Sequence, residues 1–198
     1  LGREICFSSN EDTVTITDVT DKSNPITVSR NDYQGAQYTH QGWLTEDHSY
    51  FLCNDELDEL YNGINTTTYI WDLQSLENPV LISSYDHGTA NIDHNMYVKG
   101  NFVYQSHYTA GLRIQDISDI SSGTMEEVAF FDIHPSNNAT SFDGSWSNYP
   151  YFDNNIVIVS GIGDNGNLDS GGLFILQFNE PAYPELSISY DTNISEPT

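Results

Sequence analysis

The sequence is poor in basic residues. It has 5 lysines and arginines against 29 aspartates and glutamates, which gives 198 residues a formal net charge of −24. A surface of this sign repels nucleic-acid phosphates and anionic membranes, so we expect no nucleic-acid partner. It attracts divalent cations, and it suits an exterior where salt and calcium relieve the self-repulsion. The alternative interpretation is an acidic coat that only maintains solubility.

Long hydrophobic runs are also missing. No segment approaches the roughly 18 to 20 apolar residues that a membrane helix needs. The N-terminal stretch LGREICFSSN lacks the charged and apolar regions of a signal peptide. We therefore predict no direct insertion into a membrane.

Cysteine is scarce, with Cys6 and Cys53 as the two examples. They are candidates for one disulfide, although either could pair with a residue outside this sequence. Glycosylation sequons begin at Asn65, Asn138 and Asn193, and they would accept glycans in a eukaryotic secretory pathway. These features favour an extracellular or cell-surface location without requiring it.

What the chain does contain is a repeated β-strand that alternates in polarity, ends in an acid and runs into a turn. Its copies read TVTITDVTDKSNP, TTYIWDLQSLENP, GLRIQDISDISSG and, more weakly, GLFILQFNEP. The carboxylates at the strand ends are expected to accept hydrogen bonds from turn amides just beyond them. The aligned residues are Asp18, Asp72, Asp116 and Gln177.

Three further strands accompany this one in each unit, with Gly, Asn, Asp and Pro in the gaps. Four short strands per unit, and no 3.6-residue period, predict an all-β fold: a β-propeller of four-stranded antiparallel blades. A β-sandwich is the alternative, and the equal registers disfavour it. The first strands run from His40 to Trp43, His94 to Tyr97 and Trp146 to Tyr149, and their aromatic residues Trp43, Tyr97 and Tyr149 are expected to pack between blades.

The units amount to about three and a half to four blades, because the first unit starts at its second strand. We therefore predict the C-terminal part of a larger propeller, whose remaining N-terminal blades would be partners of this part. Residues 1–180 are assigned to the blades. Residues 181–198 are assigned to a tail or linker, with ELSISY as a candidate further strand.

Several motifs in fixed order resemble a known family. They are GREICFSSNEDTVTITDVTDKSNP, YTHQGWLTED, DELDE, TYIWDLQSLENPVLI, DHNMYVKGNFVYQSHYTAGLRIQDISDI and WSNYPYF. From Arg3 to about Phe178 the chain is similar to the choice-of-anchor B domain, a group of secreted proteins with LVIVD-type propeller repeats. The resemblance implies an extracellular β-propeller that is longer at its N-terminus, and it implies no reaction. The chain departs from the pattern in the insertion GIGDNGNLDSG and in its tail.

Strand direction divides the polar residues between two ends of the propeller. Within a blade, the connection from the second to the third strand returns to the end where the first strand begins. His40 should therefore share that end, the channel mouth, with the loop NDELDELYNGIN, whereas Glu46, Asp47 and His48 should lie at the opposite end. The other groups predicted at the mouth are Asn10, Glu11, Asp55, Glu56, Asp58, Glu59, Asp93, His94, His107, Trp146, Asn148, Asp164, Asn165, Asn167 and Asp169.

Carboxylates and asparagine carbonyls in loops are the ligands that calcium prefers. We therefore predict calcium binding at the mouth, with two sets of candidate ligands. The inserted loop fails the EF-hand spacing, and its alternative interpretation is a flexible acidic turn. The sets are Asp55, Glu56, Asp58 and Glu59 in one loop, and Asp164, Asn165, Asn167 and Asp169 in the other.

His40 and His94 occupy equivalent positions in adjacent blades. Their rings could share one transition metal such as zinc, with Asp93 or a residue of the missing blades as a third ligand. The alternative is that each histidine hydrogen-bonds to the backbone of its neighbour and holds the blades together.

Two functions follow from this pattern. The preferred one is a non-enzymatic extracellular or cell-surface propeller that binds a partner or assembles with other chains. The alternative is a metal-dependent hydrolase or lyase with His40, His94 and Asp93 as catalytic candidates. No nucleophile elbow, phosphate-binding glycine loop or CxxC pair supports an enzyme, so whether the chain is one stays open.

Overall fold

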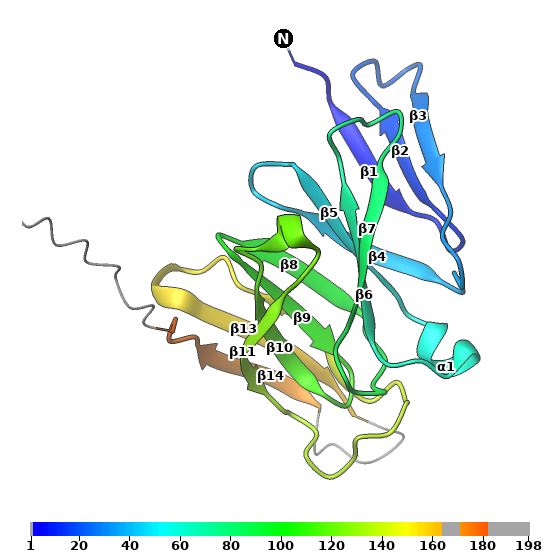
Figure 1. Cartoon of the computed structure of the whole chain (residues 1–198). Coiled ribbons are helices and arrows are strands. Elements are labelled where there is room, and N and C mark those ends of the chain that lie inside the picture. The colour runs from blue at the N-terminus through cyan, green and yellow to red at the C-terminus, as the bar shows by residue number, and fades with distance from the viewer. Residues whose placement is uncertain (1, 164–170, 182–198) are drawn as a thin grey trace, which may run out of the picture.

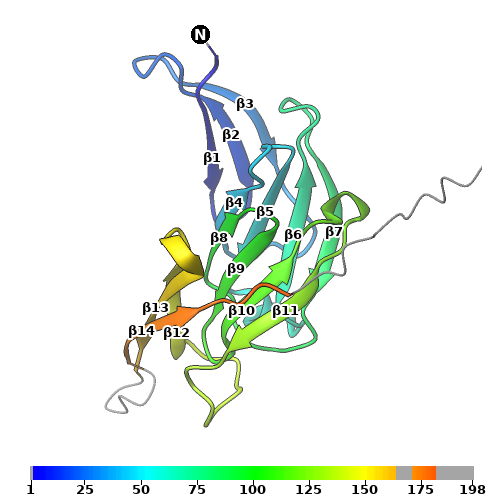
Figure 2. The same ribbon diagram turned by 90° about the vertical axis from the view of Figure 1, so that its left-hand side faces the viewer.

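The computed structural model describes residues 2–163 and 171–181. Their strands form four antiparallel sheets that follow one another as propeller blades (Figures 1 and 2). Blade I contains β1 (Ile5–Ser9), β2 (Val14–Asp18) and β3 (Ile26–Asn31). Blade II contains β4 (Thr39–Leu44), β5 (Tyr50–Asp55), β6 (Thr67–Asp72) and β7 (Val80–Asp86). Blade III contains β8 (Asn95–Lys99), β9 (Phe102–His107), β10 (Gly111–Asp116) and β11 (Glu126–Phe131), and blade IV contains β12 (Gly144–Tyr149), β13 (Ile156–Ile162) and β14 (Gly172–Gln177).

The predicted all-β propeller fold is confirmed. In every blade each strand pairs with the next one in sequence, so the sheets are simple antiparallel meanders. In the described part of the chain, blade I has the second, third and fourth strands but not the first, as the sequence predicts. The candidate strand ELSISY of the C-terminal tail lies outside the described residues.

Short helices interrupt the loops, and the strand pattern does not predict them. The α-helix α1 (Asp58–Asn62) lies between β5 and β6 and ends at Gly63, whose φ of 65° is the left-handed cap that glycine favours. Two 3₁₀ turns, η1 (Ile120–Ser122) and η2 (Asp153–Asn155), occupy other connections. In the described part of the chain, no helix is long and apolar enough to cross a membrane.

A separate apolar core fills each of the three interfaces between adjacent blades. Because the middle strands pack on both faces, they lack polar alternation: from Phe51 to Asp55, β5 is buried throughout. Burial on two faces makes each blade depend on its neighbours. The cores are Val14, Ile16, Phe51, Cys53, Tyr69, Trp71 and Leu73 between blades I and II; Leu52, Ile70, Met96, Val98, Val103, Ile117, Ile120 and Met125 between II and III; and Phe102, Tyr104, Leu112, Ile114, Ile133, Val157, Val159 and Phe178 between III and IV.

The predicted role of the strand-ending aspartates is confirmed. Each carboxylate accepts a hydrogen bond from the backbone N–H two residues later, which closes the turn at the end of a third strand. The bonds are Thr20 N–H to Asp18 Oδ1 (2.9 Å), Gln74 N–H to Asp72 Oδ1 (2.8 Å) and Ser118 N–H to Asp116 Oδ1 (2.7 Å).

The prediction that the aromatic residues of the first strands pack between blades is confirmed only in part. Trp43 and Tyr97 do contact each other between blades II and III, with ring centroids 4.9 Å apart. However, Trp43 is 38% exposed and Tyr149 is 47% exposed, and neither belongs to an interblade core. First strands are the innermost of their sheets, so these rings stand beside the cores rather than inside them.

The two cysteines are free in this structure. Cys53 is buried in β5, at the interface of blades I and II. Cys6 is exposed on β1. Its neighbour Phe7 contacts Phe51 of blade II, so alternation along the strand turns Cys6 to the other face of blade I, away from Cys53.

Gly42 offers a test of the packing between β4 and β5. A methyl group there would overlap the Phe51 ring and the Leu52 carbonyl oxygen. The φ angle of Gly42 lies outside the left-handed region, so an alanine there would add no backbone strain and the steric clash would be the cause of any destabilisation. We expect Gly42→Ala to lower the free energy of unfolding by about 2 kcal/mol, which lowers the melting temperature by about 6 °C. Gly2→Ala, where no atom lies within 4 Å, is the control, and equal melting temperatures for both variants would contradict the packing.

Candidate metal centre

The predicted division between the two ends of the propeller is confirmed. His40, at the start of β4, lies beside Glu56 in the loop after β5, with His40 Nε2 3.9 Å from Glu56 Oε2. Glu46 lies at the opposite end, where its Oε1 accepts a hydrogen bond (2.6 Å) from the backbone of Gly100 in the hairpin between β8 and β9. The two histidines and the acidic loop therefore share the channel mouth, and Glu46 does not.

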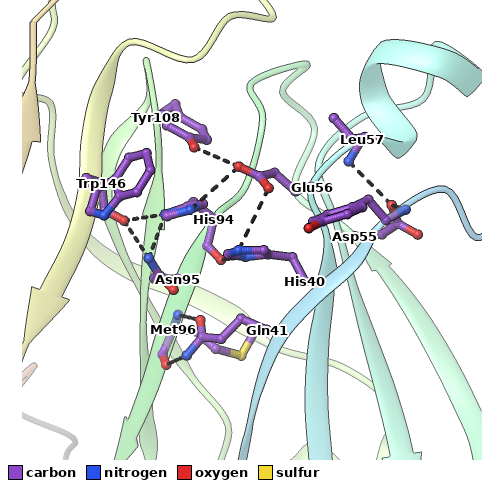
Figure 3. Close-up of polar contacts among 11 residues, drawn as sticks. His40, Gln41, Asp55, Glu56, Leu57, His94, Asn95, Met96, Tyr108 and Trp146 are labelled. Atoms are coloured by element: carbon purple, nitrogen blue, oxygen red, sulfur yellow. Dashed lines mark hydrogen bonds and ion pairs between the residues drawn. The ribbon is translucent and has the colours of Figure 1, made fainter. Parts of the chain in front are cut away.

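Two imidazoles stack at the mouth because His40 and His94 occupy equivalent places on neighbouring inner strands. Their ring centroids are 4.6 Å apart, with 22° between the planes. His40 Nδ1 lies 3.1 Å from the carbonyl oxygen of His94, and His94 Nδ1 lies 2.6 Å from that of Trp146 (Figure 3). A carbonyl oxygen can only accept, so the proton of His40 lies on Nδ1. At His94, Asn95 Nδ2 also lies 2.6 Å from Nδ1 and 2.8 Å from the same Trp146 carbonyl. We assign the His94 proton to Nδ1 because this carbonyl oxygen can accept from both groups. These bonds fix both rings with Nε2 unprotonated in the neutral form.

Both Nε2 atoms face the carboxylate of Glu56, as Figure 3 shows. Glu56 Oε1 lies 3.6 Å from His94 Nε2 and accepts a 2.7 Å hydrogen bond from Tyr108 Oη, which orients it. One ligand atom from each of His40, His94 and Glu56 lies within 4.8 Å of the others. Ligands about 2.1 Å from a tetrahedral zinc lie about 3.4 Å apart. The three side chains could therefore hold a metal ion.

The electrostatics of the group also suit a cation. Burial lowers the pKa of His94, because the charged imidazolium is poorly solvated there. A neutral His94 then turns its Nε2 lone pair towards the carboxylate of Glu56, an arrangement that a cation between them would make favourable. The His40 side chain is 26% exposed and that of Glu56 13%, so an ion can reach the group from solvent.

The third ligand of the group is Glu56 and not Asp93 as expected. Asp93 precedes His94 in sequence but is fully buried, where Asn54 Nδ2 donates to its Oδ2 at 2.6 Å. The sequence predicts Glu56 only as an oxygen ligand for calcium. Its approach to the imidazoles depends on the path of the loop into α1, which strand periodicity does not specify.

The acidic loop is less exposed than its composition suggests. Asp55, Asp58, Glu59 and Asp93 are all buried, and the loop is bound to the blades. Asp55 accepts from the backbone N–H groups of Gln37 (2.7 Å) and Tyr38 (2.6 Å) and from Tyr33 Oη (2.8 Å), and Asp58 accepts from Tyr69 Oη (2.7 Å). The stretch DELDE therefore anchors α1 and the segment before β4.

Three of these carboxyls form a second feature beneath the mouth. Asp58 Oδ1, Asp93 Oδ1 and both oxygens of Glu59 are buried without a hydrogen bond of normal geometry. Burial raises the pKa of each of the three groups. Repulsion from a neighbouring carboxylate raises it further, from Asp55 at Asp58, from Asp58 at Glu59, and from Glu59 and Asp58 at Asp93. Such groups either keep a proton near neutral pH or take up a cation.

The other residues predicted at the mouth fall into three groups. Trp146 does lie there, with its ring 4.3 Å from that of His94, and Glu11 joins His40 in lining a cavity of about 290 Å³ that includes Asn10. Asn148 is buried and donates to Tyr104 O, so it serves the blade interface. Asp164, Asn165, Asn167 and Asp169 lie outside the described residues.

The glycosylation sequon at Asn193 also lies outside the described residues. Of the other two sequons, Asn138 is exposed and Asn65 is half-buried.

His107 lies at the mouth end of β9, as predicted, but it does not face the mouth. Its side chain is fully buried between blades II and III, where Nε2 lies 2.8 Å from Gln105 Oε1 and the ring is 4.8 Å from that of His87. His87 in turn lies 2.9 Å from Thr68 Oγ1. Burial lowers the pKa of His87 to about 4 and holds that of His107 well below its usual range. His107 ends β9 rather than beginning a loop, which is why it enters the interface.

Comparison with known proteins supports the propeller fold and adds nothing about the chemistry of the site. No family profile and no curated protein sequence matches the chain. Among solved structures, it is similar to the periplasmic gluconolactonase PpgL of Pseudomonas aeruginosa, with 13% identity and a TM-score of 0.61 over 88% of this chain and 52% of that one. It is also similar to the Cps50 (Swd1) β-propeller domain of Myceliophthora thermophila, with 11% identity and a TM-score of 0.56 over 89% and 48%.

A third similar structure is the computationally designed protein Ika4, with 10% identity and a TM-score of 0.54 over 90% of this chain and 87% of that one. Identities this low show the propeller fold alone. The chain spans about half the length of the gluconolactonase and of the Swd1 domain. The resemblance to the choice-of-anchor B family stays a prediction.

The buried imidazoles give the stability of the protein a defined pH dependence. An unfolded imidazole binds a proton below about pH 6.5, but folded His87 has a pKa of about 4 and the pKa of folded His107 lies well below its usual range. In this window the unfolded chain binds more protons, so stability falls as the pH falls. We expect urea unfolding of His107→Gln between pH 4 and 6.5 to show a shallower slope, by up to about 1.4 kcal/mol per pH unit.

The exposed His48 is the matched control. The variant His48→Asn should keep the slope of the unmodified chain, because its imidazole is solvated in both states. Identical slopes for all three proteins would show that the imidazole of His107 is not shielded from protons.

Proposed function

We propose that this chain is an extracellular or cell-surface propeller module that binds a divalent transition metal at its channel mouth and uses that end in assembly. One observation carries the proposal: His40 and His94 both donate Nδ1–H to backbone carbonyls and both turn Nε2 towards Glu56. Histidine ligands in metal sites have this arrangement, with the remote N–H held by a carbonyl or carboxylate.

Zinc is the ion that this donor set suits best. Two imidazole nitrogens and one carboxylate oxygen form a borderline-soft set that zinc accepts in tetrahedral geometry. Tyr108 holds the carboxylate from behind, and the partial exposure of His40 leaves room for a fourth ligand. That fourth ligand is water in the free module, or a side chain of a bound partner.

The location and partners rest on different support. An acidic surface, exposed Asn138 in a sequon and the resemblance to secreted propellers favour an extracellular setting. The incomplete blade I and the half-length match to larger propellers favour the remaining N-terminal blades as the first partner. Other chains of the same extracellular assembly would follow, through the metal-bearing mouth.

Calcium is a second candidate ion, and the unpartnered oxygens of Asp58, Glu59 and Asp93 favour it. No basic side chain neutralises these groups, because all five basic residues are bound elsewhere. Arg3 pairs with Asp18, Lys22 with Glu4, Arg30 with Asp12 and Arg113 with Glu127, while Lys99 donates to the carbonyls of Pro150 and Phe152.

A metal-dependent hydrolase or lyase is the second candidate function. The exposed side of His40 and Glu56 would allow a metal-bound water, whose pKa such sites lower towards neutrality. Substitution of His40 and His94 separates the two functions, since an enzyme would lose its activity whereas an assembly module would lose metal-dependent association. Asp93 is fully buried, so we give it no catalytic part.

Zinc should stabilise the folded protein. We expect zinc at about 100 times its dissociation constant to add about 2.7 kcal/mol, raising the melting temperature by about 8 °C. EDTA should reverse the shift. His94→Ala and Glu56→Gln should abolish it, because each removes one of three ligands. Calorimetric melting curves of the unmodified and variant chains measure all of these effects.

His48→Asn, at the opposite end of the propeller, is the matched control and should keep the full zinc shift. A calcium titration run in parallel reports on the carboxylate group: a calcium shift that Glu59→Gln removes and Glu56→Gln spares would assign a separate site. If neither ion moves the melting temperature of the unmodified chain, the metal-binding proposal is wrong.

A further inference from the structure

One edge of blade I stands out from every other second strand. β5, β9 and β13 each pair with a strand on both sides, whereas among residues 2–163 and 171–181 β1 pairs with β2 alone. The registers make the strands equivalent, because Ile5 lies opposite Asp18 just as Tyr50 lies opposite Asp72. In blade II, one side of β5 pairs with β4, the first strand of that blade. The equivalent side of β1 is the one that lacks a partner strand in the described part of the chain.

The hydrogen bonds to β2 show which backbone groups are left at this edge. Val19 N–H donates to Glu4 O (2.8 Å) and Asn10 N–H donates to Thr13 O (2.8 Å), so even-numbered residues of this strand face β2. Alternation in an antiparallel pair then turns the N–H and C=O groups of Ile5, Phe7 and Ser9 to the vacant side. The same parity holds in blade II, where Tyr50, the equivalent of Ile5, accepts from Thr45 N–H of the inner hairpin at 3.0 Å.

A groove of about 660 Å³ runs along this edge. Ile5 and Phe7 line one side of it, and Gly42, Trp43 and Leu44 of β4 line the other. At the next interface, the equivalent space holds an inner strand: β8 lies against β4, with Tyr97 stacked edge-on to Trp43 at 4.9 Å. The groove beside Trp43 therefore has the position that the inner strand of blade I would fill.

We propose that the β1 edge is a docking site for one extended β-strand, which is the inner strand of blade I supplied by the remaining blades of a larger propeller. The strand runs antiparallel to β1 and pairs with Ile5, Phe7 and Ser9 through its main chain. This inference rests on the proposed assembly role and deepens it by naming the surface and the register. It is independent of the metal.

The repeat also specifies side chains of the docked strand. The residue opposite Phe7 corresponds to Trp43 and Tyr97, so it is aromatic and stacks on Trp43. The residue three positions before it corresponds to His40 and His94. Since His40 donates to the carbonyl of His94, and His94 to that of Trp146, this residue is a side-chain donor aimed at the carbonyl of His40.

The chain itself supplies a probe for this site. In the test protein, residues 1–4 are replaced by a second copy of residues 38–49, placed directly before Ile5. Because Ile5 is equivalent to Tyr50, the copied strand follows the register of β4. The copied Ser49 also replaces Glu4 as the acceptor for Val19, as Ser49 O already accepts from Leu73 N–H at 2.9 Å.

We expect hydrogen exchange at the amides of Ile5, Phe7 and Ser9, measured by NMR, to slow by about tenfold or more. The melting temperature should rise by about 3 °C or more. The matched control carries the same extension with proline in place of the copied Gln41 and Trp43, which removes the two main-chain donors that would pair with Ser9 and Phe7.

Equal exchange at these three amides in the extended chain and its proline control would overturn the docking proposal. Slower exchange in the extended chain alone supports it. The zinc-dependent melting shift, measured on both proteins, tests the metal centre separately. A chain that binds zinc but shows no protection at β1 would therefore refute the strand site and leave the proposed metal binding intact.

Discussion

The hydrogen bonds from inner-strand imidazoles to the backbone of the next blade are the interaction on which the mouth depends. His40 bonds to the carbonyl of His94, and His94 bonds to that of Trp146. Each bond joins two blades and fixes one ring. Structural pinning and metal binding, which look like alternatives in the sequence, are therefore compatible, because the bond made by Nδ1 is what leaves Nε2 available.

The sequence predicts those features that repeat. Strand order, the turn-closing roles of Asp18, Asp72 and Asp116, and the end at which His40 lies all follow from periodicity and strand direction, which are local properties. Features that depend on one loop were not predictable. The reach of Glu56 to the histidines and the burial of Glu59 require α1, whose position is fixed by contacts from other segments, such as the hydrogen bond from Asn62 Nδ2 to the carbonyl of Gly35.

The positions of the acidic residues explain why the composition suggests a more exposed mouth than the structure has. A net charge of −24 suggests a solvated acidic rim, yet several acids of DELDE are folded inwards and bonded to backbone amides and tyrosine hydroxyls. Backbone N–H groups stabilise a buried carboxylate without any basic residue. A chain with few lysines and arginines can thus bury Asp55 by this means, whereas Glu59 and Asp93 keep oxygens without a hydrogen bond of normal geometry.

The aspartates that close the third strands also separate the loops, whose length and composition can vary, from the blades, whose strand register cannot. Because each carboxylate ends its own strand locally, the register of one blade does not depend on the length of loops in another. The connection after β5 can therefore hold α1 and six further residues of varied chemistry while its counterpart after β9 is a three-residue turn. New ligands can be installed at the mouth by changing a single loop, with the blades retained as an unchanged frame.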